Sequence, residues 1–312
     1  MFEKKAAMFL YCVSPVHMGA GTQLGVIDNP IQRERHTEHP MMAGSGLKGA
    51  LRHDAQTRWE QSAWVHKLFG PDAKVPEHAG AISFSDAQIV LFPVRSLKQT
   101  FVYATCPTAL ARLQRTLLTA GVVDAQGWKI PELGQDDCVV VDEGKDLLVG
   151  DKLILESFQF KNNTKNSTKG MAAWLGQSAM PAEPSYFADK VKKHLVVLHD
   201  DRFNYFVRNA TVVEAHVRIS DESGTADDGG LFYTENLPSE SLLLSLGMAS
   251  RERRKKKEGD DSTSFLSAEE IMAAIIRGDK GREGFDGRLI QVGGDATTGR
   301  GQVVLRFVGG GQ

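Results

Sequence analysis

Cysteine is scarce in this chain, which has three in 312 residues: Cys12, Cys106 and Cys138. They are far apart and odd in number, whereas structural zinc sites need closely spaced cysteines and disulfide frameworks need pairs. The sequence therefore predicts neither kind of site. Because Cys12 and Cys138 stand in apolar runs, we expect both to be buried thiols.

An excess of positive charge is also missing. Lys and Arg number 37 against 39 Asp and Glu, the formal net charge is −2 and the pI is about 6.5. A protein that holds nucleic acid without help usually has a strongly basic surface. If this chain binds RNA, its basic groups must be concentrated locally or partners must contribute.

No apolar run reaches the length of a membrane helix, and the run after the charged residues 1–5 is short and interrupted by Pro15. This fits neither a signal peptide nor a membrane anchor, so we expect a cytoplasmic protein that binds no membrane. Strands and helices are interspersed without repeats, which predicts an α+β fold with a mainly antiparallel sheet and large insertions. We treat 1–312 as a single domain.

The informative residues are concentrated in the first fifty. An apolar run over 6–14 predicts a buried strand, and Gly19 and Gly21 then permit a loop with positive φ. Asp28 follows in a stretch over 22–43 that reads as a long loop. Loops of this length in a compact domain are often functional, which makes the Asp28 carboxylate a candidate for chemistry.

A basic helix is predicted after Gly44. Ser45 is expected to cap it, and the free N–H groups of 46–49 would face an anion. Lys48 and Arg52 are four residues apart and share one face, which suits phosphate contacts, although an ordinary solvated face is the alternative. Four apolar residues at helical spacing predict the buried stripe: Leu47, Leu51, Ala55 and Trp59.

Two later segments have turn signals. Residues 211–237 predict a long hairpin with a flexible tip, in which Val213 and Val217 belong to a half-buried strand. Residues 293–301 contain Gly293, Gly294 and Arg300 and form either a plain hairpin turn or a backbone nest for phosphate. The basic run over 251–257 is read as a solvated loop.

Several segments together are similar to those of a known family. The most specific is Asp-Asn-Pro-Ile-Gln-Arg-Glu-Arg-His-Thr over 28–37, and five others accompany it: 15–22, 44–52, 200–206, 231–238 and 293–301. In this order, over nearly the whole chain, they resemble the repeated backbone subunit of the type III-B CRISPR effector, the Cmr complex, in the RAMP superfamily.

The resemblance implies a ferredoxin-like, RRM-like palm with inserted fingers over about 53–190 and a thumb hairpin over about 211–237. It implies copies stacked head to tail along a guide crRNA beside other Cmr subunits, with each thumb splaying one base pair of the guide–target duplex. It also implies that an acid on the loop after the first strand cuts the target RNA with a divalent metal, Mg²⁺ or Mn²⁺. That acid maps onto Asp28.

The chemistry of the residues refines these roles. A free Asp has a pKa of about 3.9, too low for a good general base at neutral pH, so Asp28 is expected to ligate the metal or align the attacking hydroxyl. His17 is a candidate for proton transfer. Glu235 is a candidate at the thumb base, although the family pattern predicts a tyrosine or a second acid near 234 and 236. The expected RNA contacts are Arg33, Arg35, Ser45, Lys48, Arg52, Gly293, Gly294 and Arg300.

Purely structural roles are the alternatives for these residues. Asp28 can simply stabilise a turn before Pro30, and His17 can be a structural hydrogen-bonding group. For the whole protein, one alternative is a non-catalytic RNA-binding backbone subunit. Another is a standalone RAMP ribonuclease that processes precursor guide RNA, against which the single acid and the long hairpin argue.

Overall fold

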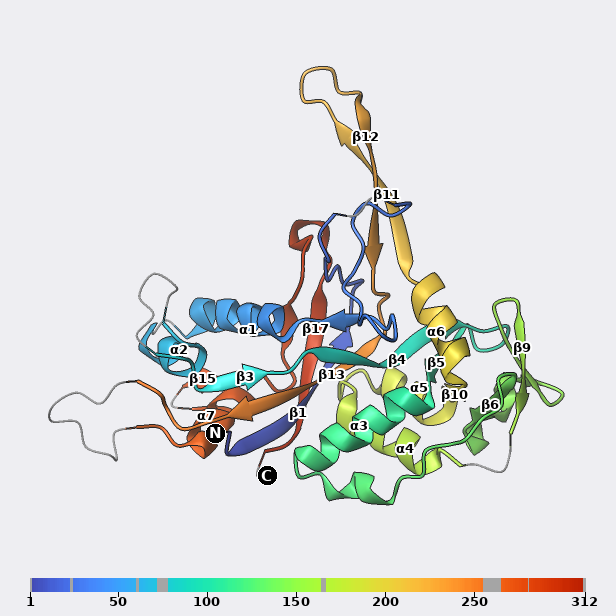
Figure 1. Cartoon of the computed structure of the whole chain (residues 1–312), viewed down its shortest axis with the longest axis horizontal. Coiled ribbons are helices and arrows are strands. Elements are labelled where there is room, and N and C mark those ends of the chain that lie inside the picture. The colour runs from blue at the N-terminus through green and yellow to red at the C-terminus, as the bar shows by residue number, and fades with distance from the viewer. Residues whose placement is uncertain are drawn as a thin grey trace, which may run out of the picture.

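The chain folds around one continuous mixed sheet (Figure 1), whose strands run in the order β16, β17, β1, β13, β4, β5, β10, β6, β9, β8, β7. Two short strands join it at the side, β2 against β4 and β3 against β13. The computed structural model describes residues 2–22, 25–59, 62–71, 78–163, 167–254, 265–279 and 281–310.

Strand β1 (Lys4–Cys12) lies in the middle of the palm, where the strand order is β17, β1, β13, β4 and every neighbouring pair is antiparallel. Helix α1 (Gly44–Arg58) precedes β4, and helix α7 (Ala268–Ile276) precedes β17, so each helix carries the chain past the strand in between. This connectivity is the predicted ferredoxin-like palm within an α+β fold. The remaining palm elements are β2 (Met41–Met42), α2 (Ser62–Phe69), β3 (Ile82–Phe84), β4 (Ala87–Arg95), β13 (Leu242–Ala249), β14 (Gly278–Asp279), β15 (Arg282–Glu283), β16 (Leu289–Gln291), η5 (Ala296–Thr298) and β17 (Gln302–Gly309).

The palm sheet is buried on both faces, which explains why β1 is continuously apolar. Met8 and Leu10 belong to a core that also contains the α1 stripe and Ile271 of α7. Phe9, on the opposite face, belongs to a second core with Leu110 of the helix that follows β5. The predicted α1 stripe is confirmed, because Leu47, Leu51, Ala55 and Trp59 are all buried.

The residues between β4 and the thumb hairpin, 96–211, extend the sheet and correspond to the predicted fingers. The predicted fingers range, about 53–190, overlaps the palm elements α1 and β4. That the chain is a single domain with these parts stays a prediction. The elements are β5 (Phe101–Thr105), α3 (Pro107–Thr119), η1 (Val123–Gly127), β6 (Asp137–Val140), η2 (Asp142–Leu147), β7 (Leu148–Val149), β8 (Lys152–Leu155), β9 (Phe158–Asn162), α4 (Lys169–Trp174), η3 (Leu175–Ala179), α5 (Ser185–His194), β10 (Leu195–Leu198) and α6 (Asp200–Asn209).

The thumb is the hairpin of β11 (Val212–Ile219) and β12 (Ala226–Asn236), which projects away from the sheet (Figure 1). The hairpin is confirmed where the sequence predicts it. The expectation of a half-buried strand is wrong: Val213 and Val217 are each 47% exposed. The alternation of apolar and polar residues predicts that the strand has two different faces. Whether other parts of the protein cover the apolar face depends on the direction in which the hairpin projects.

The start of α1 also differs from expectation. Ser45 does not cap the helix; Ala43 stands at the cap position and makes no side-chain cap bond. The Gly44 N–H instead donates to the Asp86 carboxylate at 2.8 Å, and a Cβ on Gly44 would lie 2.3 Å from the Phe84 carbonyl oxygen. A carboxylate from another segment therefore takes an N–H group at the helix start. The expectation for 46–49 is wrong at Leu47, whose N–H donates to the Ala43 carbonyl at 3.1 Å as an ordinary helix bond.

In the described ranges, no helix is long and apolar enough to cross a membrane. Of the predicted basic run, Arg251 to Arg254 follow β13, and residues 255–257 lie outside the described part of the chain.

Candidate functional site

Asp28 lies beside the base of the thumb and is held there by its own side chain. Its Oδ2 accepts a hydrogen bond from the Tyr233 N–H at 2.7 Å. The backbone of Asn29 pairs with β12 as well, donating to the Tyr233 carbonyl and accepting from the Glu235 N–H, both at 3.0 Å. The loop thus adds a short parallel bridge to β12. Within the described residues Oδ1 has no hydrogen-bond partner, so this oxygen is available to a ligand.

His17 is attached to the same strand two residues further along. Its Nδ1 lies 2.8 Å from the carbonyl oxygen of Glu235. Because a carbonyl only accepts, Nδ1 carries the hydrogen, and Nε2 is left as the nitrogen that can gain or lose a proton. Positions 233 and 235 are about 7 Å apart along a strand. Strand β12 therefore sets the spacing between the attachment points of His17 and Asp28.

Glu235 is buried, and both of its carboxylate oxygens are used by protein groups. Oε2 accepts from the Ile31 N–H at 3.0 Å, and Oε1 accepts from Thr211 at 2.8 Å. Arg33 completes the set with an ion pair of 2.5 Å, and the same guanidinium donates to the carbonyls of Glu38 and Val207. These contacts anchor the loop that carries Asp28 to the thumb base. The predicted catalytic role of Glu235 and the predicted RNA contact of Arg33 stay predictions.

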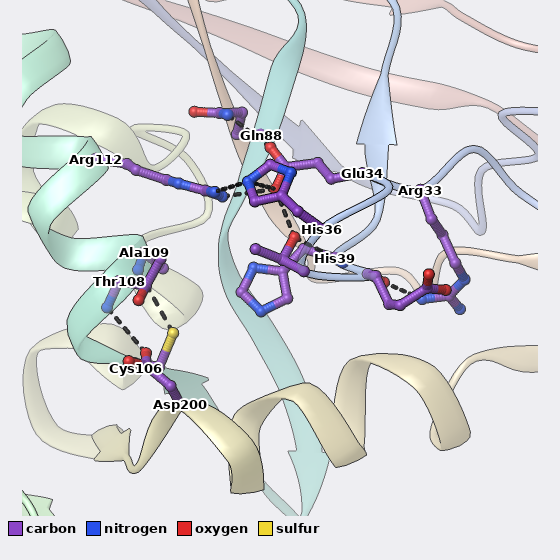
Figure 2. Close-up of polar contacts among 12 residues, drawn as sticks. Arg33, Glu34, His36, His39, Gln88, Cys106, Thr108, Ala109, Arg112 and Asp200 are labelled. Atoms are coloured by element: carbon purple, nitrogen blue, oxygen red, sulfur yellow. Dashed lines mark hydrogen bonds and ion pairs between the residues drawn. The ribbon is translucent and has the colours of Figure 1, made fainter.

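The next residues of the loop are tied to the fingers and the palm (Figure 2). Glu34 accepts hydrogen bonds from Thr37 at 2.6 Å, Arg112 of α3 at 2.7 Å and Gln88 of β4 at 2.6 Å. Burial raises the pKa of this carboxyl, but the three donors and the Arg112 charge outweigh it and lower the pKa below its ordinary value. Arg112 also bonds to His36. Sequence reasoning missed Arg112, since nothing in the helix pattern of α3 links it to residues far upstream.

Arg35, in contrast, is exposed and lines a pocket of about 390 Å³ next to the loop, which we call the α6 pocket. Ile27 and Pro30 form its wall on the side of Asp28, and Arg208 of α6 lines it as well. Arg208 is a second residue that the sequence did not single out; its position in the last turn of a helix has no distinguishing signal.

A second hollow, of about 610 Å³, lies between α1 and the turn that follows β16; we call it the α1 groove. Its lining is mostly small, with Gly46, Gly49 and Ala50 from α1 and Gly293 and Gly294 from the turn. Small side chains let a sugar–phosphate backbone approach the protein closely. The groove thus joins two of the segments that were predicted to bind RNA.

The basic residues of α1 are half-buried, and Ser45 is exposed at the helix start. Burial and the charges of Arg52 and Arg253 lower the pKa of the Lys48 ammonium. Arg52 donates to the Pro71 carbonyl at 3.3 Å. Three cations therefore share one region of the palm, as suits a polyanion, while their contact with RNA stays a prediction.

The glycine turn packs directly against His17. The Gly294 N–H donates to the His17 carbonyl at 2.9 Å, and a Cβ on Gly293, whose φ is +73°, would lie 2.3 Å from that oxygen. Arg300 makes a 2.5 Å ion pair with Glu214 on the thumb. The turn therefore positions His17 and ties the palm to the thumb, and its predicted RNA contacts stay predictions.

The thumb has one exposed apolar face above this site. Val213, Val217, Leu231 and Tyr233 point to the same side, because residues paired across an antiparallel hairpin share a face. At the base of the same face stands Glu235, opposite Val213. An apolar face that begins at the candidate site is suited to contact bases rather than phosphates.

The described residues hold no group of three or more His, Cys, Asp or Glu side chains that could bind a metal ion. Asp28 is a single carboxylate with one oxygen bonded to the backbone. The described protein groups therefore do not build a metal site by themselves; Asp28 Oδ1 can supply one of the oxygen ligands that a hard cation prefers.

The fold and the site define a known class: residues 9–304 match the model of the RAMP superfamily, and the chain belongs to that superfamily. It is 37% identical to the CRISPR system Cmr endoribonuclease Cmr4 of Pyrococcus furiosus, over 94% of this chain and 92% of that protein. It is 23% identical to the CRISPR system CMR subunit Cmr4 of Saccharolobus solfataricus, over 96% and 95% of the two chains. A crystal structure of oligomeric Cmr4 from Pyrococcus furiosus superposes with a TM-score of 0.70 at 29% identity and covers 98% of each chain. The resemblance inferred from the motifs is thereby confirmed.

Proposed function

We propose that this chain is a guide-RNA-binding backbone subunit of a cytoplasmic type III-B CRISPR effector and that it cuts complementary target RNA at Asp28. The observation that carries the proposal is the attachment of Asp28 to the base of the thumb. The 37% identical relative is an endoribonuclease by name, and a solved relative is oligomeric. Several copies stacked head to tail, beside other Cmr subunits, would form one long channel for RNA, which reconciles RNA binding with a net charge of −2.

The chemistry is an attack of the 2′-oxygen on the adjacent phosphorus. The 2′-O–P bond forms and the P–O5′ bond breaks, leaving a cyclic phosphate and a 5′-hydroxyl. A regular duplex resists the in-line geometry that this needs, and displacing one nucleotide costs a few kcal/mol. The apolar thumb face is placed to displace it, and good alignment can lower the barrier by about 7 kcal/mol.

Within this site, Asp28 Oδ1 is the group that aligns the attacking hydroxyl. His17 Nε2 is the proton-transfer atom, because Nδ1 is committed to the Glu235 carbonyl. Glu235 and Arg33 act as positioning residues, since their contacts hold the loop on β12. RNA phosphates would lie along the α1 groove. Lys48 and Arg52 are on the same helix but do not line the groove, and they would contact neighbouring phosphates.

A divalent cation, Mg²⁺ or Mn²⁺, belongs to the proposal as well. Asp28 would hold it together with phosphate oxygens of the bound RNA and water, so metal binding would depend on the substrate. When bound, the ion would offset negative charge that develops on the phosphate.

The test compares wild type with Asp28→Asn and Asp28→Ala in the complex assembled with guide RNA and partner subunits. Asparagine keeps the acceptor for the Tyr233 N–H but removes the charge. We expect wild type to make regularly spaced cuts in labelled complementary RNA with Mg²⁺. In both variants the cutting rate should fall at least a hundredfold, which corresponds to about 2.7 kcal/mol of activation free energy, while target binding is retained. Asp124→Ala, which removes an exposed carboxylate of η1, is the matched control.

Equal cutting by wild type and Asp28→Asn would exclude the charge of Asp28 from the reaction. Target binding without cutting by any protein would favour the non-catalytic backbone subunit.

A further inference from the structure

The loop that carries Asp28 has a different hollow on each side. Residues 18–20 pair with 30–32 as a short two-stranded ribbon: Gly19 bridges Ile31, and Gln32 N–H donates to the Met18 carbonyl at 2.7 Å. Gln32 lines the α1 groove, whereas its neighbours Ile31 and Arg33 line the α6 pocket. Successive residues of an extended segment face opposite sides. The ribbon therefore separates the two hollows, and Ile27 and Pro30, on either side of Asp28 in the sequence, belong to the α6 side.

The charges of the α6 pocket leave two cations without partners. Arg33 is paired with Glu235, and Glu34 is paired with Arg112, so these four groups compensate one another. The side chains of Arg35 and Arg208 are exposed and make no hydrogen bond or ion pair within the described part of the chain. The lining holds three arginines and three glutamates, with Glu38 as the remaining acid; because Arg112 compensates Glu34 from outside the pocket, one net positive charge is left.

Two guanidinium groups beside a small apolar wall are suited to one phosphodiester. Arg binds phosphate oxygens through paired N–H donors, with both charge and direction. The aliphatic surfaces of Ile27 and Pro30 are suited to the neighbouring ribose. A free base would use aromatic stacking or buried hydrogen-bonding groups, and the lining of this pocket contains no aromatic side chain among its described residues.

We propose that Arg208, together with Arg35, binds a backbone phosphate of the target strand next to the cut, while the guide strand lies on the other side of the ribbon. This inference rests on the proposed function, because the strand beside Asp28 is the target only if Asp28 cuts it. Arg208 is then a positioning residue, contributed by a fingers helix, that holds the target strand in line with Asp28.

The experiment uses the assembled complex and crosses protein variants with modified RNA. The variants are Arg208→Ala, Arg208→Lys and Arg115→Ala, an exposed arginine of α3 that lines neither hollow. The target RNAs carry one uncharged methylphosphonate linkage, moved stepwise across the cut. Single-turnover cutting rates and target affinities at two salt concentrations are measured for each combination, and thermal melting of each variant checks its folding.

We expect Arg208→Ala to slow cutting about tenfold and to lower the salt dependence of target binding by about one phosphate contact. Arg208→Lys keeps the charge and recovers part of the rate. One methylphosphonate position should slow wild type to a similar degree yet leave Arg208→Ala unchanged, because both changes remove the same contact. A merely structural role for Arg208 would not produce this coupling to a single linkage.

The inference is overturned if Arg208→Ala behaves like Arg115→Ala, or if every linkage has the same effect in wild type and variant. Failure of the proposed function looks different: wild type does not cut, or Asp28→Asn cuts normally. In that case the coupling between Arg208 and one linkage is read from target affinity alone, and its presence or absence still decides the phosphate site.

Discussion

Arg33 and Arg35 are two positions apart in the sequence and chemically identical, yet their surroundings differ completely. The Arg33 guanidinium contacts a carboxylate and two backbone carbonyls, whereas Arg35 extends to solvent beside the α6 pocket. For Arg33 to bind RNA it would have to leave a largely buried ion pair, which is costly. At the scale of single residues, the loop therefore divides its basic groups between anchoring and binding, and Arg35 is the one placed to bind.

Glu235→Ala is expected to destabilise the protein by about 3 kcal/mol, because it leaves the Arg33 charge and the Ile31 N–H without their acceptor. The measurement is the free energy of unfolding from urea titration of the full chain. The double variant Arg33→Met, Glu235→Leu should recover part of the loss. It removes both charges and leaves only neutral groups without their partners: the Ile31 and Thr211 donors and the Glu38 and Val207 carbonyls. An Ala variant as stable as wild type that nevertheless cannot cut would instead identify Glu235 as catalytic.

Helix α1 shows how one element combines stability and binding. Its buried stripe packs into the palm core, whereas its opposite side presents glycines to the α1 groove. Glycine in a helix interior is unfavourable by about 0.5–1 kcal/mol relative to alanine. No neighbouring atom lies within 4 Å of a Cβ built on Gly46 or Gly49, so packing does not require these glycines. Under the proposed function, they allow the close approach of an RNA backbone.

Gly49→Ala is accordingly expected to raise the free energy of unfolding by roughly 0.5–1 kcal/mol and to weaken guide-RNA binding, because the added methyl group enters the α1 groove. Gly170→Ala in α4 is the control: it also has free space around its Cβ, lies away from both hollows, and should leave RNA affinity unchanged. Filter-binding or fluorescence titration of the guide RNA measures the affinity. Equal affinities for the two variants would show that RNA does not approach Gly49.

At the scale of the whole molecule, the turn between the thumb and β13 links the projecting hairpin to the core. Glu240, in this turn, donates its N–H to the Cys12 carbonyl of β1 at 2.7 Å. Its Oε2 is buried and has no hydrogen-bond partner among the described residues. Burial raises the pKa of the carboxyl from its ordinary value of 4.5 to about 7. At neutral pH this acid is therefore a source of instability for the whole fold.

The sign of the effect follows from proton linkage. The folded protein keeps a proton on Glu240 that the unfolded chain has lost, so stability decreases as pH rises between about 4.5 and about 7. Glu240→Gln is uncharged in both states and lacks this decrease. We expect wild type and variant to be similarly stable at pH 4.5. At pH 8 the variant should be more stable by about 2 kcal/mol. This is less than the full pKa shift implies, because the Glu240 carboxyl is partly hydrated. Urea titrations at both pH values measure the difference. A variant that is no more stable than wild type at pH 8 would contradict the raised pKa.

Sequence alone determined the elements whose formation depends on residues that are close together in the chain. The apolar run of β1, the α1 stripe and the position of the thumb hairpin are local sequence patterns. The capping box that Ser267 and Glu270 form on α7 is also a local feature, because it is complete within one helical turn. The six motif segments, of which 28–37 is the most specific, indicated the RAMP superfamily, and the match over residues 9–304 confirms it.

Only the tertiary structure decided which charges are anchors and which are free. Arg112 and Arg208 meet the Asp28 loop from α3 and α6, and Asp86 replaces Ser45 at the start of α1, through contacts between segments far apart in the chain. The exposure of Val213 and Val217 likewise depends on the hairpin leaving the core. Periodicity records which residues share a face, whereas burial and ion pairing depend on what the fold places opposite that face.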